Sequence, residues 1–201
     1  MSVLGSSRFR PLRMLVTSLV VAGLVGSSHP ALAEDEWYLT LYGGQYAGSA
    51  SADVVKLSSP DSYVVGLGVL KEFARHDPHV RWELEGLTLQ HVGLQDHVEF
   101  AASINVRWVT FPWDADLRTS LGFGSGLSYA TEVPELEARD NPDTGSTRFL
   151  HYLMLELTFS LPSLPRWSLV GRVHHRSGAW GLFDGVGRAS NVLVGGLRYQ
   201  F

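Results

Sequence analysis

The chain has 201 residues, a formal net charge of −4 and no cysteine. The lack of cysteine excludes a disulfide framework, a thiolate zinc site and a cysteine nucleophile, and the lack of a basic run argues against a nucleic-acid partner. Hydrophobic residues make up 45% of the chain and charged residues only 18%, below the roughly 25% that is typical of soluble domains.

The first 33 residues have the features of a secretory signal peptide. Three arginines between positions 8 and 13 form a positive start, and residues 14–25 form an apolar run. This run is too short to span a bilayer, which takes about 20 residues. Ala-Leu-Ala at positions 31–33 then supplies a small-x-small cleavage site. We therefore expect residues 1–33 to be removed on export and residues 34–201 to form the mature protein.

Eight segments of the mature chain alternate apolar and polar residues, as half-buried strands do. They are rich in aromatic and β-branched residues and are separated by clusters of Gly, Pro, Asp and Ser. In chain order, we expect strands at about 36–48, 62–72, 79–91, 96–110, 116–129, 147–161, 166–177 and 190–201.

The two faces of these segments differ in chemistry. From Leu117 to Tyr129, alternate positions are mostly large and apolar, and the positions between them, from Arg118 to Ser128, hold only Arg, Ser and Gly. Since successive strand residues point to opposite sides, one side of the sheet is apolar and the other is small and polar. Charged residues of the second side are expected to form an interior ion-pair network: Glu83, Glu85, Glu99, Arg107, Arg118, Glu156 and Arg172.

Two barrel types fit this pattern. A soluble barrel of the lipocalin type places its apolar side inside, whereas a transmembrane barrel places it outside and fills a narrow interior with small and polar residues. Phe201 ends an alternating strand, which resembles the C-terminal signature of bacterial outer-membrane barrels. Aromatic residues also cluster near the strand ends, as in an interfacial girdle. The predicted fold class is therefore all-β, an eight-stranded antiparallel transmembrane β-barrel of outer-membrane type over residues 34–201.

The connections predict which end of the barrel faces outward. Outer-membrane barrels have short periplasmic turns and longer external loops, and residues 49–61, 130–146 and 178–189 form the longer polar connections. This arrangement places the end of the seventh strand at the extracellular rim. There His175 and Ser177 share the outward, lipid-facing side, where polar side chains are costly. They are either a functional pair or two residues in the headgroup zone without a role.

The motif His175-x-Ser177, near the C-terminus of an exported eight-stranded barrel, resembles the lipid A 3-O-deacylase family (PagL-type). The specific part of the resemblance covers about residues 170–201. It implies that Ser177 is the nucleophile, that His175 is its base and that an acid lies on the last strand. It also implies a site that faces the outer leaflet and removes an ester-linked acyl chain from lipopolysaccharide.

Two positions depart from the family pattern. The family's Glu falls near Asn191, which cannot supply a charge but can accept a hydrogen bond from His175 and fix its tautomer. Asp184, in the preceding loop, is the alternative acid. The family's oxyanion-binding Asn is replaced by Gly178, which leaves the backbone N–H groups of Gly178 and Ala179 for that role.

The predicted function is an outer-membrane esterase that acts on lipid A and needs neither a metal nor another cofactor. Its expected partners are lipopolysaccharide and outer-membrane lipids, and the sequence leaves open whether the barrel forms a homodimer. The alternatives are a non-catalytic barrel with a structural, adhesion or binding role, and a soluble ligand carrier. His151, outward on the sixth strand, either lines a substrate groove or is an interfacial residue.

Overall fold

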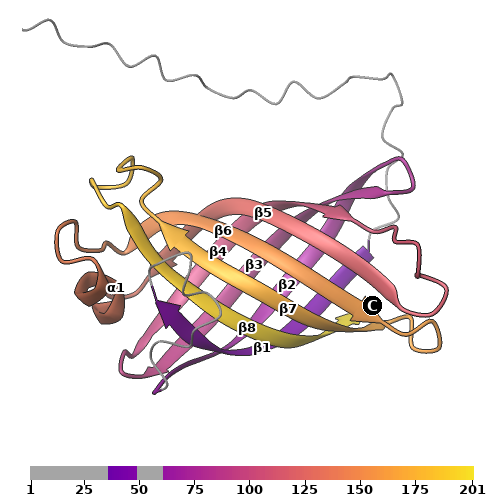
Figure 1. The fold of residues 1–201 in the computed structure, drawn as a ribbon, viewed down its shortest axis with the longest axis horizontal. Coiled ribbons are helices and arrows are strands. Elements are labelled where there is room, and N and C mark those ends of the chain that lie inside the picture. The colour runs from indigo at the N-terminus through magenta and orange to yellow at the C-terminus, as the bar shows by residue number, and fades with distance from the viewer. Residues whose placement is uncertain (1–35, 49–60) are drawn as a thin grey trace, which may run out of the picture.

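Eight antiparallel strands close into a barrel, drawn in Figure 1. The structure is a computed structural model that describes residues 36–48 and 61–201, so the expected signal peptide lies outside the described residues. The strands are β1 (Glu36–Gly48), β2 (Ser62–His76), β3 (Val80–Gly93), β4 (His97–Trp108), β5 (Arg118–Ala130), β6 (Phe149–Ser160), β7 (Trp167–Ser177) and β8 (Arg188–Gln200). Each strand pairs with its neighbours in the chain, and β1 also pairs with β8. The predicted all-β, eight-stranded fold class is confirmed.

One strand is longer than its pattern predicts. The sequence predicts a connection over residues 73–78, whereas β2 continues to His76 before a tight turn at Asp77, whose φ is 55°. A bulge between Glu72 and Ala74 shifts the register with β3. Because a bulge inserts an extra residue, it interrupts the alternation on which the prediction depends.

The outer surface of the barrel is apolar. Leu41 on β1 and Leu169 on β7 are each 64% exposed, and every other strand also carries exposed large apolar side chains. Exposed aromatic residues gather near both ends of the strands: Trp37, Phe73, Trp82, Trp108 and Trp167 at one end, and Phe100, Tyr129 and Phe149 at the other. An apolar band between two aromatic girdles is the exterior of a transmembrane barrel.

The interior holds the charged network that the alternation predicts. Glu156 lies at its centre, with Arg107 at 2.6 Å, Arg172 at 2.5 Å and Arg198 at 2.9 Å from its carboxylate oxygens. The prediction is wrong for Arg118, which is exposed at the first position of β5. Arg198 of β8 joins the network in addition to the predicted residues.

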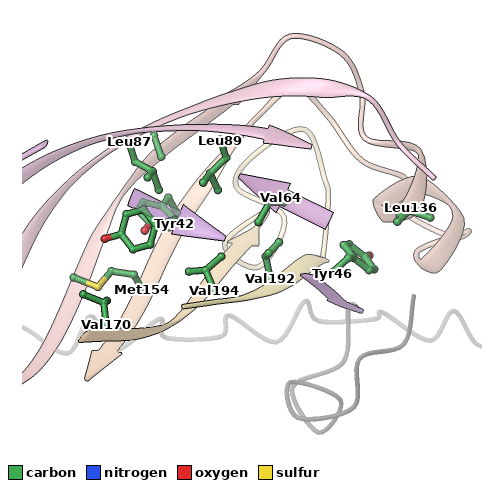
Figure 2. Packing of buried hydrophobic residues seen from close by; sticks show 12 residues of the cluster. Tyr42, Tyr46, Val64, Leu87, Leu89, Leu136, Met154, Val170, Val192 and Val194 are labelled. Atoms are coloured by element: carbon green, nitrogen blue, oxygen red, sulfur yellow. The ribbon is translucent and has the colours of Figure 1, made fainter. Parts of the chain in front are cut away.

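A cluster of buried apolar residues also lies inside the barrel, as Figure 2 shows. It includes Tyr42, Val64, Leu87, Leu89, Met154, Val170, Val192 and Val194. The prediction that the interior is small and polar is therefore incomplete. The larger apolar side chains fill space beside the ion pairs, as expected for an eight-stranded barrel, which is just wide enough for side chains to fill.

A short helix, α1 (Glu135–Asp140), lies at the same end of the barrel as the β7–β8 loop (Figure 1). The sequence predicts only a polar loop here. Leu136 packs with the interior cluster, and Glu137 accepts hydrogen bonds from Arg176 of β7 (2.8 Å) and Ser190 of β8 (2.5 Å). Within residues 36–48 and 61–201, no helix is long and apolar enough to cross a membrane. Through Glu137, α1 holds the C-terminal end of β7 and the N-terminal end of β8 together from inside the barrel.

Candidate active site

The C-terminal end of β7 brings the predicted residues together. His175 and Ser177 are two positions apart, which places their Cβ atoms about 6–7 Å from each other. His175 lies opposite Asn191 of β8, and Ser177 lies opposite His151 of β6. A register shift between Arg176 and Ser177 marks a bulge against β8, and bulges next to active sites re-aim side chains. The strand register thus gathers two histidines, a serine and an asparagine.

A hydrogen bond joins the imidazole of His175 to the side-chain amide of Asn191. Nδ1 of His175 lies 2.8 Å from Oδ1 of Asn191, and Nδ2 of Asn191 donates to the carbonyl of Gly48 at 3.0 Å. The second contact fixes the amide, because its nitrogen faces Gly48 and its oxygen faces the imidazole. Nδ1 therefore carries the proton. Nε2 is left as the acceptor, which is the tautomer that a general base requires.

Asp184, the alternative acid, is engaged elsewhere. It is exposed in the β7–β8 loop, and its carboxylate accepts a hydrogen bond of 3.1 Å from Oγ1 of Thr147. This contact ties the β7–β8 loop to the segment before β6. Of the two predicted candidates, Asn191 is the one that contacts His175.

The β7–β8 loop leaves no room for a side chain at position 178, directly after Ser177. The N–H of Gly178 donates to the carbonyl of Gly187 at 2.9 Å, and a Cβ at position 178 would lie 1.8 Å from the carbonyl oxygen of Val186. A side chain at this position would therefore collide with the returning loop. The Gly178 amide is also engaged within the loop, although the sequence predicts it as an oxyanion donor. Ala179, the other predicted donor, has a φ of 47°, a conformation that clusters at functional sites.

A pocket of about 420 Å³ opens on the outside of the barrel and is lined by His151, His175, Ser177, Ala179 and Trp180, among others. An apolar groove of about 210 Å³, lined in part by Phe123, Leu155 and Val173, shares His175 and Leu153 with this pocket. Within the described residues the hydroxyl of Ser177 has no hydrogen-bond partner. Catalytic hydrogen bonds are commonly long without substrate and tighten when it binds.

Ser125 and His151 form a second polar pair on the exterior. Oγ of Ser125 lies 3.0 Å from Nε2 of His151, and the ring of Phe183 stacks beside that imidazole at a centroid distance of 6.4 Å. Sequence parity places both residues outward but does not pair them. The signal that could have found them is two polar residues at outward positions of adjacent, otherwise apolar strands.

The fold is similar to that of solved outer-membrane barrels. Neisserial surface protein A has a TM-score of 0.51 and 13% identity, over 83% of this chain and 97% of that one. The N-terminal barrel domain of Pseudomonas aeruginosa OprF has a TM-score of 0.48 and 10% identity, over 84% and 100%. The outer membrane enzyme PagL has a TM-score of 0.49 and 12% identity, over 82% and 98%. Neither a family model nor a curated protein matches the sequence. The chain is thus an eight-stranded barrel of the outer-membrane type, and the likeness concerns the fold alone.

Proposed function

We propose that this protein is an outer-membrane esterase that removes an ester-linked acyl chain from the lipid A of lipopolysaccharide. The observation that carries the proposal is the hydrogen bond between His175 and Asn191. His175 lies two residues before Ser177, and both line the same pocket. His175 is half-buried, and Ser177 and Asn191 are buried, at outward positions of strands whose exposed side chains are mostly apolar. Polar residues in such positions are costly, and those that persist in membrane proteins mark functional sites.

The chemistry is acyl transfer to a serine. Nε2 of His175 takes the proton from Ser177, whose oxygen attacks the ester carbonyl carbon and forms a tetrahedral alkoxide. Asn191 keeps the proton on Nδ1 of His175, so that Nε2 stays available as the base. The intermediate collapses, His175 returns the proton to the leaving alcohol, and water hydrolyses the acyl-enzyme by the reverse sequence. This route needs no metal.

The position of the site supports a lipid substrate in the outer leaflet. β7 has 11 residues and β6 has 12, and about 9–11 residues suffice to span a bilayer. Ser177, at the end of β7, therefore lies near the boundary between acyl chains and headgroups. The apolar groove beside His175 suits an acyl chain, and the larger pocket under the β7–β8 loop suits the sugar headgroup. Export by a signal peptide over residues 1–33 is part of the same proposal.

The test uses the folded, full-length mature barrel in detergent micelles with lipopolysaccharide. Mass spectrometry is expected to detect a released fatty acid together with lipid A that is lighter by one acyl chain. A folded barrel that releases no fatty acid from lipopolysaccharide would instead be a non-catalytic structural or binding protein.

Asn191→Glu is expected to raise the deacylation rate about tenfold. A carboxylate at this position would accept a charge-assisted hydrogen bond from His175 and stabilise the imidazolium, and such bonds exceed neutral ones by roughly 1.4 kcal/mol. Asp184→Asn serves as the matched control and should leave the rate unchanged, because Asp184 contacts Thr147 and not the imidazole. If Asp184→Asn instead lowered the rate by orders of magnitude while Asn191→Glu had no effect, Asp184 would be the residue that orients His175.

A further inference from the structure

The polar pair formed by Ser125 and His151 takes no part in the mechanism described so far. The register partner of Ser125 on β6 is Leu153, and that of His151 on β5 is Leu127. Phe123 and Leu155 continue the same exterior toward the other end of the barrel. An imidazole and a hydroxyl are expensive among these lipid-facing side chains. Their hydrogen bond lowers this cost but does not explain why either group is present.

His151 is placed at the nucleophile by strand pairing. It lies directly opposite Ser177 in the β6–β7 ladder, and residues opposite each other in antiparallel strands have Cβ atoms about 4.5–5.5 Å apart. This separation is shorter than the roughly 6–7 Å between His175 and Ser177 along β7. Both histidines and Ser177 line the same pocket. Ser177 is therefore flanked by one imidazole from its own strand and one from its neighbour.

The contact with Ser125 matches a tautomer of His151 in which the hydroxyl donates to Nε2 and the proton lies on Nδ1. Oγ of Ser125 lies 3.0 Å from Nε2 of His151, and a serine hydroxyl can donate or accept in such a contact. A neutral imidazole whose Nε2 accepts a hydrogen bond carries its proton on Nδ1. In the described part of the chain, Nδ1 of His151 has no hydrogen-bond partner. With the hydroxyl of Ser125 as donor, His151 is a pocket-lining side chain whose Nδ1–H is available to an acceptor.

The acylation step described above needs hydrogen-bond donors for the oxyanion, and few are available. The Gly178 amide already donates to Gly187, which leaves the Ala179 amide as the remaining predicted backbone donor for the developing oxyanion. Histidine side chains can serve as oxyanion-hole donors. The geometry points to His151 as a catalytic residue: its Nδ1–H donates to the carbonyl oxygen that becomes an alkoxide when Ser177 attacks, and Ser125 holds the required tautomer.

The inference, which rests on the proposed function, adds one hydrogen bond to the acylation step. As the bond between Oγ of Ser177 and the carbonyl carbon forms, the π electrons of the carbonyl move to its oxygen and the serine proton moves to Nε2 of His175. The alkoxide then accepts hydrogen bonds from Nδ1–H of His151 and the N–H of Ala179. When the carbonyl re-forms, the bond to the leaving alcohol breaks and His175 protonates that alcohol, so His151 neither gains nor loses a proton.

The test compares steady-state kinetics of deacylation by folded wild type, His151→Phe and Ser125→Ala. His151→Phe keeps an aromatic ring but removes the donor, so kcat should fall about 10²–10³-fold while KM stays unchanged. Ser125→Ala should lower kcat by about fivefold, because the tautomer is no longer fixed. An alkyl boronic acid, which forms a tetrahedral anion on a serine oxygen, should inhibit His151→Phe more weakly by about the same factor as the loss of kcat. His79→Phe, at the opposite end of the barrel, is the matched control and should leave both constants unchanged.

Two results separate the inference from the proposed function. If the wild type is active and Ser177→Ala is inactive, but His151→Phe retains full kcat and boronate affinity, the role of His151 is refuted and the esterase proposal stands. A rise in KM alone for His151→Phe would also refute it, because that change belongs to a residue that only binds substrate. If the folded wild type itself has no activity, the esterase proposal fails first, and the role of His151 fails with it.

Discussion

Glu156→Ala is expected to prevent the barrel from reaching its folded, heat-modifiable form. This carboxylate contacts Arg107, Arg172 and Arg198 and is fully buried. Removing one partner of a buried ion pair costs about 3–5 kcal/mol, because it leaves an uncompensated charge. The deletion removes the carboxylate partner of Arg198 and one of the two carboxylates that Arg107 and Arg172 each contact, so the loss should be about that size.

The measurement is the folded fraction on unheated gels after refolding into detergent micelles, together with unfolding in urea. Glu156→Gln, which keeps the shape and two polar atoms but removes the charge, should be destabilised less than the alanine variant. Glu135→Ala is the matched control, since Glu135 is exposed on α1. Equal unfolding midpoints for Glu156→Ala and wild type would show that the network does not stabilise the barrel.

Ser177→Ala is expected to abolish deacylation, with a loss on the order of 10⁴-fold or more, and to leave the folded fraction unchanged. Loss of the nucleophile removes the covalent route altogether, and the residual rate then comes from binding and oxyanion stabilisation alone. The stability should be retained because the Ser177 hydroxyl has no hydrogen-bond partner among the residues that the structure describes. His175→Ala should behave in the same way.

Ser168→Ala provides the control for this result, because it removes a hydroxyl from the other end of the same strand. Its deacylation rate should equal that of the wild type. If Ser177→Ala released acyl chains as fast as Ser168→Ala, another group would be the nucleophile. The Ser125–His151 pair would then be the next candidate, since it is a hydrogen-bonded serine and histidine on the same exterior.

Strand parity was sufficient to predict most of the fold and part of the site. The alternation from Leu117 to Tyr129 separated the lipid-facing side chains from the interior ones, and the same logic placed Asn191 on the face of His175. Parity works here because a closed sheet of long strands fixes the side of every residue. It failed after Phe73, because the bulge between Glu72 and Ala74 inverts the alternation in the rest of β2.

Features that depend on tertiary contacts were not predictable. α1 has only six residues and depends on the burial of Leu136 and Glu137 against the barrel mouth, and an isolated helix of that length is not stable. The engagement of the Gly178 amide depends on how the loop returns to Gly187, ten positions later than Ser177 in the chain. Ser125 and His151 are 26 residues apart, so that only the register of β5 and β6 brings them together.

Removal of an acyl chain from lipid A in the outer leaflet is the activity proposed for the barrel. Its most direct test is the mass spectrum of lipid A from cells that carry the wild type, Ser177→Ala or no copy of the protein, with folded barrel in the outer-membrane fraction confirmed in the first two. Lipid A from wild-type cells should lack one ester-linked acyl chain, and lipid A from the other two should be identical and complete. Complete lipid A in cells that hold folded wild-type barrel would contradict the claim.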